Sequence, residues 1–337
     1  MRVDSRVSVV SGALWLPEGR STVEDALLDG VLADGRSVPA GTDSVPECHG
    51  ETPEHMAAEA VRRALARAGR PVEAVDMLAF AWTARFAGEL YSPPFRLAKA
   101  LAVGDCATVG IVQACNGGTT AVEVAVTRML AEDSVRLAVA VSSDSFEPFG
   151  SVRWTDPALM VVGDGAAAAV LGRGQGRFAL RSLATRGHTC AGMLEAGQDI
   201  RTWLPDAGED AGRSSARLLT EAAHSVEQSR RCTHEAVDQA LDDAGLRADD
   251  PGIVAVLLPR LADPFIESFV RSALPEPLRA FARVPDAYTG HLGSGDTLAN
   301  LEYAQRCVTL APGEHLLVVN SGQGVMSSCL VLASGVG

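Results

Sequence analysis

The stretch Gln113-Ala114-Cys115-Asn116-Gly117-Gly118 decides how the rest of this 337-residue sequence is interpreted. It closes an apolar run, Thr108–Ala114, whose length suits a buried strand, and it precedes a helical pattern over Thr119–Leu130. We therefore expect Cys115 at a helix N-terminus, where free backbone N–H groups and the helix dipole favour an anion. This position predicts a nucleophilic sulfur, and a small buried apolar cysteine is the alternative. The two glycines would let a substrate or a neighbouring chain segment approach the backbone closely.

Outward from this turn, short apolar runs alternate with amphipathic stretches, which predicts an α/β fold with largely parallel sheets. Thr52-Pro53 and Gly69 are typical start and stop signals for a helix over Pro53–Ala68. In the second half we expect two helices, Ser214–Arg230 and then His234–Ala244 with Thr233 as its N-cap. The acidic, glycine-containing stretch 203–212 is expected to be an exposed loop.

A weak internal repeat indicates that the two halves of the chain are similar. Each half is expected to run strand, small-residue turn into helix, strand, then glycine-rich turn into strand. We place the join near Gly172–Arg177, with an N-terminal half over 1–174 and a C-terminal half over 175–337. Three pairs of segments match, in the same order in both halves. They are Val75–Trp82 with Ile253–Leu258, Ile111–Leu130 with Tyr288–Val308, and Leu137–Leu171 with Leu316–Leu332.

Composition excludes several classes of protein. The 29 basic and 42 acidic residues give a net charge of −13, which argues against a nucleic-acid partner but allows a local Arg patch for an acidic one. The seven cysteines form no CxxC pair and no Cys/His metal spacing, so neither a disulfide framework nor a metal site is expected. The sequence has no signal-peptide pattern and no apolar run of the ~18 residues that a membrane span needs. We expect a cytoplasmic protein that does not enter membranes.

The Cys115 turn resembles the active-site turn of ketosynthase III enzymes, the β-ketoacyl-acyl-carrier-protein synthase III branch of the thiolase superfamily. The resemblance spans nearly the whole chain. It implies the thiolase fold, two similar α/β halves forming a layered α-β-α-β-α core, and a homodimer. Three more motifs resemble the family in order: Val162-Gly163-Asp164-Gly165-Ala166-Ala167-Ala168, Gly290-His291-Leu292-Gly293-Ser294-Gly295-Asp296 and Ser321-Gly322-Gln323-Gly324.

The sequence departs from the family at the other catalytic positions. The family's His lies in a Pro-His-Gln-Ala-Asn segment, where this chain has Pro259-Arg260-Leu261-Ala262-Asp263. Arg260 is a permanent cation and cannot serve as a general base near neutral pH. At the family's Asn position stands His291, with Asp296 five residues later. The resemblance therefore implies that the residues for decarboxylative condensation have been replaced.

Cys115, His291 and Asp296 are the predicted catalytic residues. Cys115 and His291 open equivalent helices of the repeat, so we expect them to face each other, with Asp296 orienting the imidazole. A capping or core role for His291, and an N-cap role for Asp296 before the helix Thr297–Cys307, are the alternatives. Similar His-for-Asn patterns with a later Asp mark acyltransferase offshoots of ketosynthase III in antibiotic and polyketide pathways.

The predicted function is acyl transfer without decarboxylation and without a metal or redox cofactor. Cys115 would attack a carrier-protein or coenzyme A thioester, with the oxyanion held by the N–H groups of Cys115 and of Gln323 or Gly324. His291 would then remove a proton from an O, N or S acceptor, a small molecule or a second carrier protein. Residues that bind a cofactor are not identified by the sequence.

Other residues and functions stay open at this point. His188 and Arg260 are further pocket candidates, and an ordinary loop position is the alternative for His188. Arg85, Arg96 and Arg153 could contact a pantetheine phosphate or carrier-protein carboxylates, or simply be solvated. The alternative functions are a condensing (starter-unit) enzyme of ketosynthase III type and a catalytically silent thiolase-fold partner subunit. Arg260 and His291 argue against the first, and the presence of Cys115 argues against the second.

Overall fold

A computed structural model describes most of the chain. No helix of the described residues is both long and apolar enough to cross a membrane. The predicted loop over 203–212 lies outside the described residues. These residues are 1–32, 38, 41–83, 92–146, 153–154, 160–174, 176–188, 215–322 and 325–335, with the backbone alone for 215–225.

The two halves of the chain build the same five-stranded unit, in the order β1-β7-β6-β4-β5 and β8-β12-β11-β9-β10. In each unit the first strand pairs antiparallel with the second and the second with the third, whereas the third, fourth and fifth strands run parallel to one another. The first unit contains β1 (Val7–Trp15), β4 (Met77–Ala81), β5 (Ala107–Ile111), β6 (Leu137–Asp144) and β7 (Gly165–Arg173). The second contains β8 (Phe178–Gly187), β9 (Ile253–Leu257), β10 (Ala282–Arg283), β11 (His315–Gly322) and β12 (Met326–Ser334).

A short contact joins the two units. Ser8 pairs with Ala179 and Val9 with Phe178, so β1 and β8 connect the units into one ten-stranded sheet. β7 ends at Arg173, and β8 begins at Phe178, the residue that pairs with Val9 in this contact. The division into halves at 174/175 remains a prediction, whereas the repeated strand order is observed directly.

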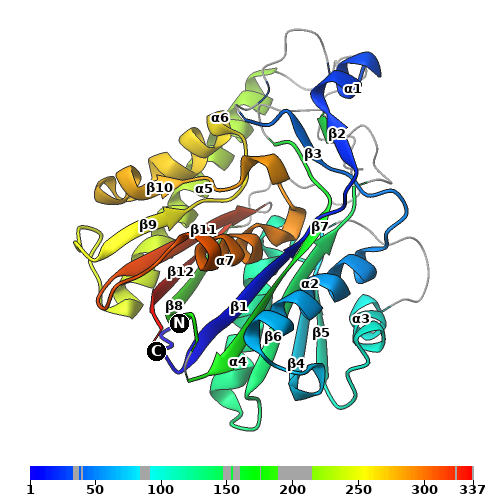
Figure 1. The fold of residues 1–337 in the computed structure, drawn as a ribbon. Helices are drawn as coiled ribbons and strands as arrows, with labels where there is room; N and C mark the ends of the chain where they lie inside the picture. The colour runs from blue at the N-terminus through cyan, green and yellow to red at the C-terminus, as the bar shows by residue number, and fades with distance from the viewer. Residues whose placement is uncertain are drawn as a thin grey trace.

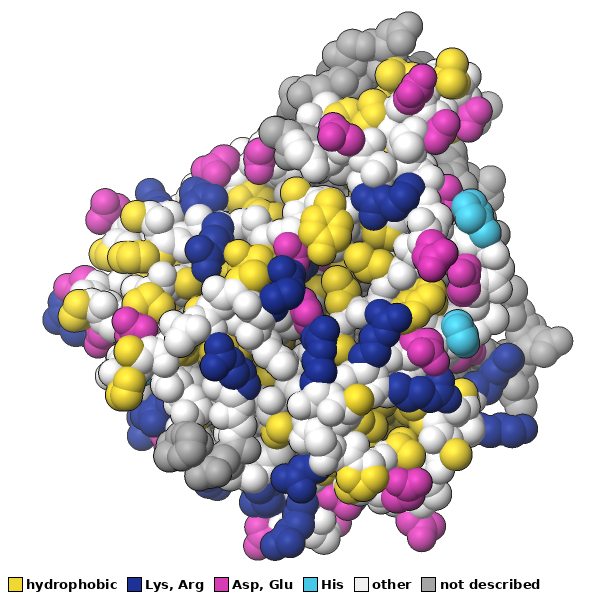
Figure 2. All heavy atoms as spheres, in the orientation of Figure 1, with side chains coloured by type: hydrophobic (Ala, Val, Ile, Leu, Met, Phe, Trp, Pro, Cys, Tyr) yellow, Lys and Arg dark blue, Asp and Glu magenta, His cyan; other side chains and the backbone are white. Residues whose placement is uncertain are grey.

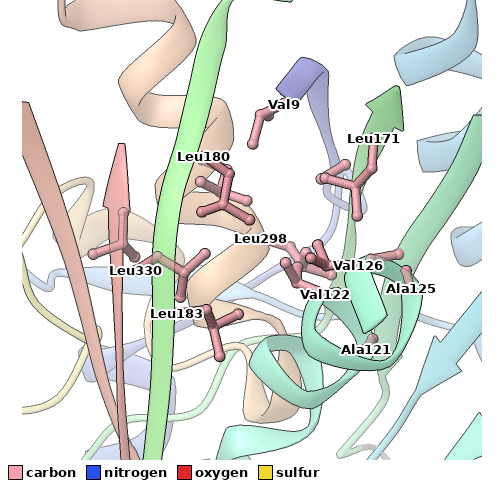
Figure 3. Packing of buried hydrophobic residues seen from close by; sticks show 14 of the residues in the cluster. Val9, Ala121, Val122, Ala125, Val126, Leu171, Leu180, Leu183, Leu298 and Leu330 are labelled. Carbon is pink, nitrogen blue, oxygen red and sulfur yellow. The ribbon is translucent and has the colours of Figure 1, made fainter. Parts of the chain in front are cut away.

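Helices lie between and outside the two units (Figure 1). The central layer is α4 (Gly117–Ala131) and α7 (Asp296–Cys307), whose buried side chains share one apolar cluster with strands of both units. Figure 3 shows Val122 of α4 and Leu298 of α7 meeting in this core. On the outer faces, α2 (Pro53–Ala68) and α3 (Pro93–Leu101) cover the first unit, and α5 (Ser215–Ala244) covers the second. The expected α-β-α-β-α layering is therefore confirmed.

The start and stop signals predicted for α2 are confirmed. The Thr52 hydroxyl accepts from the His55 amide, and Gly69 ends the helix at φ 62°.

The smaller elements lie mainly in connections between these layers. The remaining α-helices and strands of the described residues are β2 (Arg20–Thr22), α1 (Val23–Leu28), β3 (Ser44–Pro46) and α6 (Asp263–Phe265), with π-helix Ile266–Val270 after α6. The described 3-10 segments are Val72–Ala74, Ala114–Asn116, Arg271–Ala273, Glu276–Phe281, Ala287–Thr289 and Gly293–Gly295.

One helix prediction was wrong. The chain does not break at Thr233, because α5 continues without interruption from Ser215 to Ala244. Thr233 is fully buried inside this helix, and its hydroxyl bonds the Ser327 hydroxyl of β12 at 2.8 Å. A Thr before an apolar periodic run matches an N-cap in sequence, but here the hydroxyl bonds a strand instead of the helix.

His234→Pro distinguishes one continuous α5 from two helices. Proline is favoured at the first position of a helix but destabilises a helix interior by about 3 kcal/mol. We therefore expect H234P to lower the free energy of unfolding by about that amount in urea titrations. His234→Ala is the matched control, since the side chain is half exposed. Equal stabilities of the two variants would mean that a new helix begins at this position.

Candidate active site

Cys115 lies in a tight turn between β5 and α4. The turn is a single 3-10 segment, Ala114–Asn116, and Ala114 has a positive φ of 44°. A non-glycine residue in this left-handed region stores backbone strain, which is frequent at functional sites. Cys115 itself is partly buried with a free thiol. The strained turn therefore presents the sulfur at the N-terminal end of the central helix α4.

Two strands of the second half, β11 and β12, hold this turn through side-chain hydrogen bonds. The Asn320 side-chain amide of β11 donates to the Cys115 carbonyl at 2.9 Å. Asn116 is fully buried, and its amide donates to the Ser328 hydroxyl of β12 at 2.9 Å. The Cys115 turn of one half is thus fixed by polar groups of the other.

Gly117 and Gly118 make room for a neighbouring segment of the same chain. A Cβ at Gly118 would collide with the Ser294 carbonyl oxygen, and one at Gly117 would lie 3.0 Å from the Ser294 Cβ. The glycines therefore allow the turn before α7 to lie directly against the start of α4.

His291 reaches Cys115 across the boundary between the halves. Its Nε2 lies 3.1 Å from the Cys115 Sγ, and its Nδ1 lies 2.7 Å from the Asp296 Oδ2. His291 and Asp296 are buried, with 1% and 0% of their surface exposed. Because a carboxylate only accepts hydrogen bonds, Nδ1 donates to Asp296 and Nε2 faces the sulfur. The three side chains are thus connected in the order expected of a nucleophile, a base and an orienting carboxylate.

The backbone of His291 is held by the Val162–Ala168 motif. Val162 forms a parallel bridge with His291, whose amide donates to the Val161 carbonyl at 2.7 Å. The Gly163 amide donates to the His291 carbonyl at 3.0 Å, and a Cβ at Gly163 would collide with the Thr289 carbonyl. The motif therefore holds the backbone segment that carries the imidazole.

Asp296 is the first residue of α7, and Gly295 is its N-cap. Besides His291, the carboxylate accepts from the Arg260 amide at 2.7 Å and from the Leu292 amide at 3.0 Å. Burial alone would raise the pKa of Asp296, but His291, Arg260 and the Leu292 amide together lower it. The hydrogen bond to the imidazole shows that Asp296 is more than a helix cap.

The electrostatics of the pair favour an imidazolium. Burial opposes the charged ring, but the Asp296 carboxylate and the Cys115 sulfur outweigh it and raise the pKa of His291 well above its usual value. While Asp296 is ionised, the charged His291 ring therefore stabilises the fold fully below the ordinary histidine pKa of about 6.5. This stabilisation is lost as pH rises through the raised pKa of the folded state.

Arg260 lies behind the carboxylate. Its Nη1 donates to the Asp296 carbonyl at 3.1 Å and to Asn300 Oδ1 at 2.6 Å, both on α7. The side chain is buried, which lowers the pKa of the guanidinium against the opposing effect of Asp296 and Asp286. The guanidinium therefore binds the first turns of α7, and its backbone amide supports Asp296.

Comparison with solved structures identifies the architecture. The chain matches ChlB3, titled an acyltransferase, with 25% identity over 98% of both chains and a TM-score of 0.79. It also matches 3-oxoacyl-(acyl carrier protein) synthase III from Pseudomonas aeruginosa with 18% identity over 98% and 100% of the chains and a TM-score of 0.75. This chain has the thiolase fold. A scan of protein-family models and a search of curated proteins gave no match.

A third thiolase-fold match is AbyA1, titled a tetronic acid condensing enzyme, with 23% identity over 97% and 100% of the chains and a TM-score of 0.73. The titles of these thiolase-fold structures name both acyl transfer and condensation. The resemblance to ketosynthase III enzymes inferred from the motifs is therefore confirmed.

The remaining predicted residues of this thiolase-fold chain are placed as follows. His188 follows β8, and its amide donates to the Val325 carbonyl at 2.9 Å. Arg96 is exposed on α3, with its Nε 3.7 Å from a Glu54 carboxylate oxygen. Gln323, Gly324 and Arg85 lie outside the described residues. Among the described residues, no group of three or more His, Cys, Asp or Glu side chains could hold a metal ion.

The prediction for Arg153 was wrong. The side chain is 3% exposed, so it is neither solvated nor open to a phosphate or a partner protein. Its guanidinium binds the Asp164 carboxylate at 2.9 Å and the backbone carbonyls of Pro46 and Val162. A buried ion pair with further hydrogen bonds satisfies the charge within the fold.

Three residues in the structure were not singled out by the sequence. Asn320 and Ser328 hold the Cys115 turn, and Asp144, at the end of β6, accepts from Ser294 before α7. The available signal was weak: each is a polar residue in a strand that is otherwise largely apolar. Only the tertiary contacts connect them to the site.

Asp296→Asn tests the electrostatic role of the carboxylate. The variant removes a charge that raises the pKa of His291, so its imidazolium should lose the proton at lower pH than in wild type. The measurement is an NMR titration of ¹⁵N-labelled histidines. Asp238→Asn, which affects only the half-exposed His234 pair, is the matched control and should leave His291 unchanged. A titration of His291 that is identical in D296N and wild type contradicts the assignment.

Proposed function

We propose that this chain is an acyltransferase of natural-product biosynthesis. It would move an acyl group from a carrier-protein or coenzyme A thioester, through a thioester on Cys115, to an O, N or S acceptor without decarboxylation. The observation that carries the proposal is the 3.1 Å contact between the Cys115 Sγ and the His291 Nε2, with Asp296 behind the ring. The similarity to a structure titled acyltransferase supports it.

The first half-reaction forms the acyl-enzyme. The Cys115 sulfur, with its proton on His291, attacks the thioester carbonyl, and the oxyanion is stabilised by the Cys115 amide at the start of α4. A second donor is proposed at Gln323 or Gly324. The carbon–sulfur bond of the donor then breaks, and the departing thiol takes the proton from His291. Cys115 is left as the acyl thioester.

The second half-reaction transfers the acyl group. His291, now neutral, removes the proton of the acceptor as its O, N or S atom attacks the acyl carbon. The bond to Cys115 breaks, and Asp296 stabilises the imidazolium that forms. Neither half-reaction needs a metal or redox cofactor, because the thioester supplies an already activated acyl group.

Decarboxylative condensation is the second candidate, because a matched structure is titled a condensing enzyme. Against it, Arg260 directs its guanidinium to Asn300 and the Asp296 carbonyl on α7. The described side chains thus place one imidazole, His291, within hydrogen-bonding distance of the sulfur, and it is already paired with a carboxylate. A catalytically silent partner subunit is also disfavoured, because the thiol, the imidazole and the carboxylate of Cys115, His291 and Asp296 are all present and in contact.

Mass spectrometry of the intact protein tests the proposal. After incubation with acetyl- and malonyl-coenzyme A, wild type should gain one acyl increment, and Cys115→Ala should gain none. Cys307→Ala is the matched control, since Cys307 is an exposed free thiol open to non-specific acylation, and it should behave as wild type. An increment that survives in C115A rules out Cys115 as the nucleophile.

The same incubations separate the alternatives. With a malonyl thioester labelled in its free carboxylate, the proposal predicts no labelled carbon dioxide. Release of the label with wild type would favour the condensing enzyme. The absence of any increment with the thioesters tested would favour the silent subunit.

The partner and compartment of the enzyme are part of the proposal. Figure 2 shows basic side chains gathered over the middle of one face of a chain whose net charge is −13, which suits an acidic donor such as a carrier protein. Six of the cysteines, Cys115 among them, are free thiols in the structure. Free thiols support a reducing, cytoplasmic environment.

A homodimer is proposed through the β5 edge. β5 is the outermost strand of the first unit, and unpaired edge groups can pair with a second copy. Beside it, Val112 and Phe95 are large apolar residues with 69% and 67% of their surface exposed. Sedimentation equilibrium should give twice the chain mass of 35.1 kDa, and Val112→Lys should lower it. A wild-type mass of one chain contradicts the dimer.

A further inference from the structure

The turn before α7 repeats the geometry of the Cys115 turn. Each central helix follows a one-turn 3-10 segment, Ala114–Asn116 before α4 and Gly293–Gly295 before α7. The first residue of each segment has a positive φ, 44° at Ala114 and 58° at Gly293. Ser294 therefore occupies, in the second half, the position that Cys115 occupies in the first. His291 and Asp296 lie on either side of this second turn.

A carboxylate of the first half holds this second turn. Asp144 is the last residue of β6 and is 1% exposed. Its Oδ2 accepts from both the amide and the hydroxyl of Ser294, each at 2.9 Å. Its Oδ1 accepts from the Thr83 amide at 2.6 Å, just beyond β4. The Ser294 hydroxyl also bonds the Ser142 hydroxyl at 2.8 Å.

The fit between Asp144 and the turn is close. A Cβ at Gly293 would collide with the Asp144 carboxylate, and the positive φ of Gly293 also favours glycine. Hydrogen bonds to a charged acceptor are about twice as strong as neutral ones. This single carboxylate therefore connects the ends of β4 and β6 to the turn between the base and its orienting carboxylate.

The contact mirrors the one that holds the nucleophile. In the first turn, Asn320 at the end of β11 binds the Cys115 carbonyl. In the second turn, Asp144 at the end of β6 binds Ser294. Each half thus fixes the turn of the other, and the separation of sulfur and imidazole depends on both contacts.

We infer that Asp144 is a positioning residue for acyl transfer. By holding the turn 292–295 against the first half, it keeps the His291 Nε2 within hydrogen-bonding distance of the Cys115 Sγ. Asp144 touches neither reacting atom in the described contacts and acts through the turn. This inference rests on the proposed function, because it assumes that the sulfur and imidazole work as a pair.

Asp144→Asn is the central variant. An Asn side chain has one acceptor oxygen and one NH₂ donor. Its NH₂ group would therefore face the N–H donor of either the Ser294 amide or the Thr83 amide, and one of these hydrogen bonds would be lost. The turn should loosen and the imidazole should leave the sulfur. The readout is the rate of Cys115 alkylation by iodoacetamide between about pH 5 and pH 9, since an imidazolium-paired thiolate stays reactive at acidic pH. We expect D144N to react about tenfold more slowly than wild type near pH 6.

The matched control is Asp76→Asn. Asp76 accepts from the amides of Arg136 and Leu137 at the opposite end of β6, so the variant makes the same chemical change away from the turn. D76N should keep the wild-type pH profile even where it lowers the melting temperature. A purely structural role of Asp144 would lower the melting temperature and leave the profile of Cys115 unchanged, which overturns the inference.

Ser294→Ala keeps the test decisive if D144N does not fold. It removes the hydroxyl contacts to Asp144 and Ser142 but leaves the backbone contact, so we expect a smaller loss of reactivity at acidic pH. A wild-type profile in S294A and in any folded D144N contradicts the inference. If wild-type Cys115 reacts at acidic pH no faster than an ordinary thiol, the proposed function, which needs the Cys115–His291 pair, fails instead. This outcome distinguishes a failure of the proposed function from a failure of the inference about Asp144.

Discussion

The contact between the Cys115 sulfur and the His291 imidazole is the interaction on which the site depends, because it joins two separately folded turns. The sulfur belongs to the first half and the ring to the second, 176 residues apart in sequence. Each turn opens one of the two central helices, α4 and α7, which pack together between the two five-stranded units. The distance between the sulfur and the imidazole is therefore set by how closely these helices approach.

Small residues and buried polar contacts allow that approach. Gly117 and Gly118 admit the Ser294 backbone, and Gly163 admits the Thr289 carbonyl. Polar side chains at the strand ends then fix each turn, where an unpaired buried group would be costly. Asp296, surrounded by His291 and two backbone amides, stays ionised in a buried site. The same close packing thus supports both the fold and the electrostatics of the proposed transfer.

Much of the fold and of the candidate site could be predicted from local sequence motifs. The thiolase fold, the repeat and the meeting of Cys115, His291 and Asp296 could be inferred from the sequence, because turns into helices and family-like motifs leave local marks. The sequence around a residue does not reveal which distant residue its side chain will contact. Thr233 matched a cap but bonds β12. Arg153 matched a surface arginine but is buried against Asp164. Asp144 ends an apolar strand, and nothing local indicates that it reaches a turn 150 residues away.

The most direct measurement of the central claim is cross-linking with 1,3-dibromoacetone, a short bifunctional reagent that alkylates a thiol and then a neighbouring imidazole. Proteolysis and mass spectrometry should recover one bridged peptide pair, with Cys115 joined to His291, and the pair should be absent from His291→Ala. Alkylation of Cys115 without a bridge, or a bridge to another histidine, would show that the sulfur and this imidazole do not meet.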